Sequence, residues 1–346
     1  MSDSDWLNPR RQLDLFGLEK ARQLALTAAS PVEQQQRLAR LDVAHDVLSS
    51  LPTSEELSFL HSALAQTFLP HARLSNNQAI WTRHSGRLSL IVRPGLVENR
   101  PAQSRRAKPT SAEQEAMHVG VPYGAKARLI LMHVQSEAVA RGREVQLGNN
   151  LTTWLRSLGV TPSSGPRGSI AAVREQALRI SRCLFTIQFD RTTADGEHIS
   201  SLRDFSIAED LELVAKAGEF WPRSILLDNR FFEHLREHAV PLDRRAIAHL
   251  AGNSLGLDLY ALFAYRLPRL KANLQLRWDQ LAAQLGASQA ETKGLARRIR
   301  AVLPDVIAGY PEAKIEIMRH GLLLMPNRPS IPSTQVRGFR VLEGGR

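Results

Sequence analysis

The chain has 346 residues but only one cysteine, Cys183. A single thiol excludes an internal disulfide framework and a cysteine-based zinc cage. No run approaches the roughly 18 apolar residues that a membrane-spanning helix requires, and the polar N-terminal residues lack the apolar core of a secretion signal. We therefore expect a cytoplasmic protein without a membrane partner.

Several catalytic signatures are missing as well. The sequence has no Gly-x-x-x-x-Gly-Lys-Ser/Thr motif, which excludes a P-loop ATPase, and no His-x-His pair of the kind that serves nicking enzymes. Aromatic residues make up 6% of the chain and no Arg/Gly-rich tract is present, so stacking on single-stranded nucleic acid fits less well than duplex binding. We expect a binding protein without a cofactor or an enzymatic activity of its own.

Positive charge is abundant and unevenly distributed. The formal net charge is +11, and residues 101–191 and 259–346 carry surpluses of seven and eight positive charges. Residues 192–258 between them carry an excess of five negative charges. Two separate basic surfaces are therefore expected, and a surplus of this size indicates a polyanionic partner such as nucleic acid.

The first third of the chain predicts helices and then a linker. Residues 1–85 show apolar positions at helical spacing, including a second helical segment over 54–69 that begins with a capping pattern. Apolar and polar residues alternate over 86–96, and the alternation ends at Pro94-Gly95, which predicts a strand and a turn. The polar, proline-containing residues 97–116 predict a basic linker, so 86–116 forms a strand plus linker.

The next segment has the element order of a winged helix. Residues 122–142 predict a helix, 143–148 a short strand, 149–159 a second helix and 168–182 a third helix that runs directly into a strand. Turn residues at Asp195-Gly196 predict that this strand begins a hairpin. Helix, strand, helix, helix and hairpin is the order of the winged-helix version of helix-turn-helix.

The same order recurs downstream. Helices are predicted over 254–270, 274–286 (after a short extended entry) and 289–310, followed by a hairpin over 313–326 with its turn near His320-Gly321. The predicted fold is therefore α+β and mostly helical. It comprises a helical N-terminal segment (1–85), two tandem winged-helix units (117–228 and 229–326) and a C-terminal tail (327–346).

The third helix of the downstream unit predicts a basic face opposite an apolar one. At 100° per residue, Leu295, Ile299, Val302 and Val306 share one side. Arginine suits a DNA-reading helix because its planar fork pairs with guanine O6 and N7 or grips a phosphate. The candidate DNA-binding residues of this helix are Lys293, Arg297, Arg298 and Arg300.

The third helix of the upstream unit predicts a similar basic face. Arg179 and Arg182 project outward on the helical wheel, and Arg174 lies on the flank. Arg167 and Ser169 stand at the helix start, where free backbone N–H groups favour a phosphate. Three alternatives remain: the arginines form only a solvated face, Glu175 reads a cytosine amino group, or Glu175 pairs with Arg179 four residues on.

The segment His234-Leu-Arg-Glu237-His238 has the spelling of one zinc-peptidase class. Both histidines would share a helix face, and Glu237 would act as the base of a metallohydrolase. A five-residue match is weak, and the surrounding residues predict an ordinary amphipathic helix from Asn229. A surface helix with two unliganded histidines is the expected outcome, so no metal site is predicted.

The upstream unit resembles the plasmid-encoded RepA replication initiators of bacteria. The resemblance rests on Pro122-Tyr123-Gly124 before the first helix, Leu147-Gly148 with Gly159 around the second, and Arg174-Glu175-Gln176 with Arg182 in the third. It is clearest over 115–190 and extends plausibly to 326. It implies a protein that binds repeated duplex sites at a plasmid origin, helps to open adjacent A·T-rich DNA and recruits the host replication initiator and helicase. A homodimer is possible, and a transcriptional repressor of the same fold remains an alternative.

Overall fold

The computed structural model describes residues 8–98, 116–147, 151–163, 165, 168–193, 195–216, 219–285, 292–332 and 335–336. The chain folds into two compact units. The central unit comprises Leu69–His238, and the discontinuous unit comprises Met1–Phe68 together with Ala239–Arg346. Helices and strands are both abundant, so the fold is mixed α/β. Within the described residues, no helix is both long and apolar enough to cross a membrane.

Two N-terminal helices open the discontinuous unit, α1 (Pro9–Ala25) and α2 (Pro31–Ser49). Asn8 and Ser30 cap them by accepting backbone N–H groups, and a proline follows each cap at the first helical position. The helices pack on each other through a small apolar core, and α2 also packs on the later helix α10 through Val43, Ala44 and Ala308. The predicted helical N-terminus is confirmed to this point.

The predicted helix over residues 54–69 is wrong. Here the chain forms β1 (Leu57–His61), whose five residues are all buried. Its partner is β11 (Ala239–Asp243), which pairs antiparallel to it from Leu57↔Asp243 to His61↔Ala239. A short apolar run fits a buried strand or a helix equally well, and the partner that decides the outcome lies about 180 residues away in the chain.

The remainder of the discontinuous unit follows the predicted order. After α7 (Arg244–Leu250) come α8 (Ser254–Arg266), the 3₁₀ turn η3 (Leu267–Arg269), β12 (Leu274–Arg277), α9 (Trp278–Leu285) and α10 (Thr292–Gly309). The hairpin of β13 (Ile315–Met318) and β14 (Gly321–Leu324) completes a three-stranded sheet in the order β12-β14-β13. A Cβ atom on Gly321 would stand 2.0 Å from the carbonyl oxygen of Leu276, so only glycine allows β14 to approach β12 this closely.

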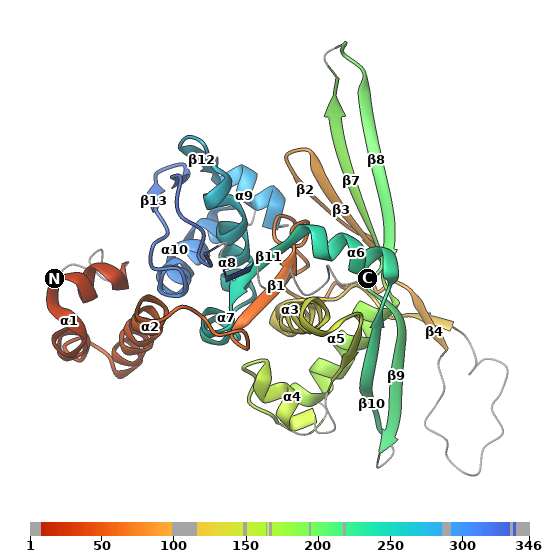
Figure 1. Cartoon of the computed structure of the whole chain (residues 1–346), viewed down its shortest axis with the longest axis horizontal. Helices are drawn as coiled ribbons and strands as arrows, with labels where there is room; N and C mark the ends of the chain where they lie inside the picture. Colours follow the sequence, from red (N-terminus) through yellow and green to blue (C-terminus); the bar gives the residue numbers. More distant parts are fainter. Residues whose placement is uncertain are drawn as a thin grey trace. The chain divides into compact units, whose positions relative to one another are not determined.

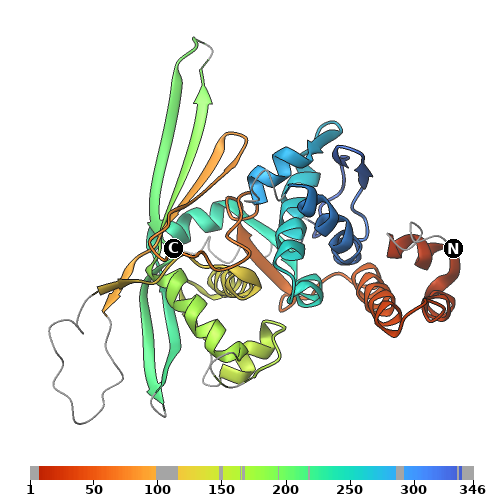
Figure 2. The same ribbon diagram turned by 180° about the vertical axis from the view of Figure 1, so that it is seen from behind.

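The central unit contains a sheet that the sequence only partly predicts. The strands β2 (Trp81–Ser85), β3 (Leu88–Arg93), β7 (Leu184–Thr192) and β8 (His198–Ser206) form a four-stranded antiparallel sheet in that order. The β7–β8 hairpin turns at Asp195-Gly196 as predicted, and it extends well beyond β2 and β3 (Figures 1 and 2). The strands β4 (Leu96–Glu98) and β5 (Ala116–His118) pair with each other, and most of the predicted linker lies outside the described residues.

A second sheet supports the helices of the central unit. These helices are α3 (Gly124–Arg141), α4 (Leu151–Ser157), α5 (Ser169–Arg182) and α6 (Asn229–His238). The short strand β6 (Glu144–Gln146) follows α3 but pairs with β10 (Glu219–Leu227), which in turn pairs with β9 (Ala208–Lys216). The β9–β10 hairpin was not predicted. The resulting order, β6-β10-β9, has the same pattern as β12-β14-β13 in the discontinuous unit.

Stacked aromatic rings join the four-stranded sheet of the central unit to α6. Phe205 stacks on Phe185 and on Phe231, with ring centroids 5.8 and 5.0 Å apart. All three side chains are buried. The helix α6 therefore belongs with the central unit, whose division from the discontinuous unit falls after His238 and not at the predicted position 228/229.

Candidate nucleic-acid interface

Helix α10 presents the basic face that its sequence predicts. Leu295 and Ile299 are 1% and 0% exposed, and Val302 and Val306 are buried on the same side. Arg297, Arg298 and Arg300 are exposed. Lys293 lies within α10, but its side chain is outside what the structure describes. The helix is therefore held by its apolar side with at least three arginines in solvent.

The β13–β14 turn is fixed to α9, next to this basic face. The indole Nε1 of Trp278 donates to the carbonyl oxygen of Arg319 at 3.1 Å, and its backbone N–H donates to that of His320 at 3.0 Å. The guanidinium carbon of Arg300 stands 5.2 Å from the centre of the Trp278 ring, within the range of a cation–π contact. Arg319 and His320 are themselves exposed. Trp278 therefore joins the α10 arginines and the hairpin turn into one basic surface.

The sequence did not single out Arg319, yet a signal for it was present. It lies at the turn of a predicted hairpin, and in a winged helix that turn lies beside the reading helix. We call Arg297, Arg298, Arg300 and Arg319 the α10 basic surface. Nearby, Arg277 is neutralised by Asp279, whose Oδ2 lies 3.0 Å from Nη2.

The upstream helix α5 differs, because Arg179 does not project outward. Its side chain is 3% exposed, and Nη1 donates to the carbonyl oxygen of Val121 at 2.9 Å. Nη2 and Nε donate to Glu175 at 2.7 and 3.1 Å. The prediction of an outward-facing Arg179 is wrong, and the alternative of a pair with Glu175 is what the structure shows.

The motifs that carry the RepA resemblance meet at this buried arginine. The guanidinium of Arg179 lies 5.1 Å from the Tyr123 ring, and the Tyr123 hydroxyl donates to Glu175 at 3.3 Å. The backbone N–H of Tyr123 donates to Gln176 Oε1 at 2.8 Å. Burial, together with the Glu175 carboxylate, raises the pKa of Tyr123. Pro-Tyr-Gly and Arg-Glu-Gln are therefore two halves of one contact between the start of α3 and the middle of α5.

The remaining upstream candidates occupy mixed positions. Ser169 is used locally: its hydroxyl donates to the carbonyl oxygen of Thr161 at 2.9 Å, and its backbone N–H donates to Ser163 Oγ at 2.8 Å. Arg182 is exposed and donates to the carbonyl oxygen of Leu96 at 3.2 Å. Arg174 is half-buried, and Arg167 lies outside the described residues. Of the upstream arginines that the structure describes, only Arg182 is exposed, so α5 presents fewer exposed basic side chains than α10.

The His234-Leu-Arg-Glu-His238 segment forms the predicted amphipathic helix α6. The two imidazole rings are 4.2 Å apart. Burial, His238 and Arg203 lower the pKa of His234 to about 4. Across the described residues, no group of three or more histidine, cysteine or acidic side chains is placed to hold a metal ion.

A Gly-x-Ser-x-Gly spelling, residues 252–256, also occurs in the chain. A nucleophile elbow requires a strand that turns sharply into a helix. Here the segment connects α7 to α8, and Asn253 Oδ1 accepts the backbone N–H of Gly256 at 3.0 Å. The segment is therefore a capped helix start, without the strand that would present Ser254 as a nucleophile.

A partly buried charge cluster anchors α10 to two other helices. Arg40 on α2 makes a bidentate contact with Asp305, with Nε–Oδ1 and Nη2–Oδ2 distances of 2.8 and 3.0 Å. His249 Nε2 on α7 lies 3.2 Å from Oδ1 of the same carboxylate. Burial alone would raise the pKa of Asp305. Hydrogen bonds from His249 and Arg40 nevertheless hold this pKa below its usual range. The N-terminal helix α2 thus holds α10 in place through the Arg40–Asp305 contact.

The fold and surface define a mixed α/β protein with an arginine-rich helix face mounted on a small three-stranded sheet. Residues 121–280 match the family model described as plasmid encoded RepA protein. This match confirms the resemblance to the plasmid-encoded RepA family that the sequence predicts. No curated protein matches the chain.

Among solved structures, the chain is similar to two of RctB. A selenomethionine derivative of domains 2 and 3 of RctB is 13% identical, with a TM-score of 0.43, over 78% of this chain and 98% of that one. A second structure of RctB domains 2–3 is also 13% identical, with a TM-score of 0.38, over 76% of this chain and 94% of that one.

Proposed function

We propose that the protein initiates plasmid replication by binding repeated sites in double-stranded origin DNA. The family match over residues 121–280 supports the initiator role. The observation that carries the DNA-binding part is the α10 basic surface, where Arg297, Arg298 and Arg300 stand in solvent on a helix fixed by a buried opposite side.

Both units are proposed to be winged-helix modules. The shared sheet orders β12-β14-β13 and β6-β10-β9 support this, since each places the first short strand beside the last strand of a hairpin. In the discontinuous unit α10 would be the reading helix and the β13–β14 turn the wing. In the central unit the β9–β10 hairpin takes the place of the wing.

The α10 basic surface is proposed to enter the major groove. Arginine forks on α10 would contact base edges or phosphates, and Arg319 on the turn would contact the flanking backbone. The chain would act by binding energy, without catalysis of its own, in the cytoplasm. Opening of the neighbouring A·T-rich DNA would then depend on the host initiator and helicase, and a homodimer would match repeated or inverted sites.

A footprint of the full-length protein on DNA flanking its gene tests the proposal. Protected repeats spaced by about one helical turn or a multiple of it are expected. An Arg297→Ala/Arg300→Ala variant is expected to lose this protection. The control Arg269→Ala/Lys271→Ala removes the same charge from η3 and the residues that follow it, and should retain the protection. Equal protection by both variants would exclude α10 as the reading helix.

A second measurement separates an initiator from a repressor. A plasmid that carries the origin but lacks the gene is introduced into cells that supply the protein in trans. An initiator restores replication of that plasmid, whereas a repressor with the same DNA sites does not. Potassium permanganate probing of the A·T-rich segment would report strand opening in the same cells.

A further inference from the structure

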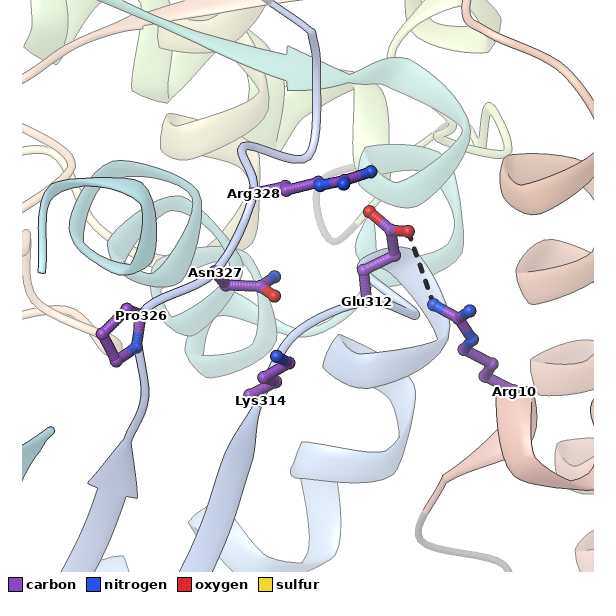
Figure 3. A pocket seen from close by; sticks show the side chains of 6 residues that line it. All are labelled: Arg10, Glu312, Lys314, Pro326, Asn327 and Arg328. Carbon is purple, nitrogen blue, oxygen red and sulfur yellow. Dashed lines mark hydrogen bonds and ion pairs between the residues drawn. The ribbon is translucent and has the colours of Figure 1, made fainter.

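The discontinuous unit has a polar hollow at the base of the β13–β14 hairpin. It encloses about 550 Å³ and is lined by Arg10, Glu312, Lys314, Pro326, Asn327 and Arg328. Arg10 comes from α1, Lys314 from the segment before β13, and Asn327 and Arg328 from the segment after β14 (Figure 3). Helix α1 and the two ends of one hairpin therefore bring three cations to this pocket.

We propose that this pocket binds an anion that carries a phosphate group. The volume lies within the range of small-ligand sites, roughly 300–1,000 Å³, and four of the six lining residues carry a charge. Among the described residues, no carboxylate lies within ion-pair distance of Lys314 or Arg328. Two guanidinium groups and an ammonium group around one hollow match the oxygens of a phosphate better than any neutral ligand.

Glu312 is the group that an anion would have to displace. Its Oε1 lies 3.4 Å from Arg10 Nη1, and the two side chains are 44% and 39% exposed. Arg10 also contacts Asp14 at 3.3 Å. Exposed pairs at such distances contribute little, so a dianion can compete with Glu312 for Arg10 at a small cost. Figure 3 shows Glu312 between Arg10 and Arg328, where it would occupy the place of a ligand.

The floor of the pocket is held in place by buried groups. Tyr310 is 1% exposed, and its hydroxyl donates to the carbonyl oxygen of Arg328 and accepts from Asn327 Nδ2 at 3.3 Å. The carbonyl oxygen of Lys314 accepts the backbone N–H of Met325 at 3.1 Å. The backbones that carry the two unpaired cations are thus fixed before any ligand arrives, which lowers the entropic cost of binding.

The pocket is separate from the α10 basic surface within the same unit. Arg300 is nine residues before the end of α10 at Gly309, about 13 Å along the helix axis at 1.5 Å per residue. The pocket lies beyond that end, at the opposite end of the hairpin from Arg319. A ligand there would not compete directly for the α10 arginines. The inference does not rest on the proposed function.

The test uses the full-length protein, with inorganic pyrophosphate titrated by calorimetry at constant ionic strength. Binding is expected, and Lys314→Gln/Arg328→Gln should weaken it at least tenfold. The matched control, Arg269→Gln/Lys271→Gln, removes two charges from the same unit and should bind like the parent protein. Circular dichroism melting checks that each variant is folded, and Lys314→Arg should retain binding because it keeps the charge.

A second titration identifies the source of the phosphate. A short non-specific duplex, followed by fluorescence anisotropy, replaces pyrophosphate. If the pocket variant weakens pyrophosphate binding alone, the ligand is a free phosphate compound, whereas weakened duplex binding indicates the DNA backbone. The proposal is overturned if the pocket and control variants behave alike towards both probes. The Arg297→Ala/Arg300→Ala variant, which tests the proposed function, should still bind pyrophosphate like the parent protein. The two proposals can therefore fail separately.

Discussion

Nη2 of Arg179 lies 2.7 Å from Oε1 of Glu175, one helical turn earlier on α5, and the arginine side chain is 3% exposed. This arginine also donates to the carbonyl oxygen of Val121 and faces the Tyr123 ring. A residue that looks like a DNA contact on a helical wheel is therefore a structural tie between α5 and the start of α3.

Replacing Arg179 with alanine is expected to destabilise the protein by about 2–3 kcal/mol, since it removes the donor to the Val121 carbonyl oxygen and the nearest cation of Glu175. Urea unfolding monitored by tryptophan fluorescence measures this change. Arg182→Ala, on the same helix but exposed, should change stability by less than about 0.5 kcal/mol. Equal effects of the two substitutions would contradict the structural role of Arg179.

The exposed arginines of α10 lead to the opposite expectation. The Arg297→Ala/Arg300→Ala variant should melt like the parent protein but bind origin DNA more weakly. If both side chains contact phosphates, the slope of log affinity against log salt should fall by about two, because fewer counterions are released. Gel-shift titrations between 50 and 200 mM salt supply the slope. An unchanged slope with weaker binding would assign the arginines to base edges instead.

The contacts of Asp305 with Arg40 and His249 are expected to stabilise the protein less at acid pH. Because the pKa of Asp305 is lowered in the folded state, its contribution to stability is present above the unfolded value of about 3.9 and is lost as the pH falls through the lower folded value. Asp305→Asn should cost about 2 kcal/mol at pH 7 and should flatten the decline in stability below about pH 4. Thermal melting of both proteins from pH 3 to 7 shows whether the curves converge at the acid end.

His234 is expected to be neutral at pH 7. Its pKa of about 4 lies below the unfolded value of about 6.5, so the unfolded chain takes up a proton first as the pH falls. The stability linked to His234 is therefore present above pH 6.5 and declines between pH 6.5 and 4, by about 1 kcal/mol after allowance for solvent screening. The imidazole signals in an NMR titration should show the midpoint near 4. A midpoint above 6 would refute the burial argument.

The apolar side of α10 was predictable because one helix contains the whole pattern. Leu295, Ile299 and Val302 repeat at helical spacing, and burial against the sheet then forces the arginines outward. The order from α8 to β14 was predictable for the same reason, since each element carries its own caps and turns. Local signals sufficed there.

Residues whose environment comes from distant segments were not predictable in the same way. β1 was expected to be helical because its pairing with β11 cannot be seen from residues 54–69 alone. The burial of Arg179 depends on Val121 and Tyr123, more than fifty residues earlier, and only Glu175 at i−4 gave a local indication. The pocket around Lys314 gave no signal because Arg10 joins it from the far end of the chain.

The β1–β11 ladder also bears on synthesis at the ribosome. The strand pair ends at His61 and Ala239, so the partner of β1 is made only after the 177 further residues from Ser62 to His238. Val43 and Ala44 on α2 pack against Ala308 of α10, which is made later still. The central unit can thus be completed on the ribosome while β1 and the α10-facing side of α2 still lack their partners.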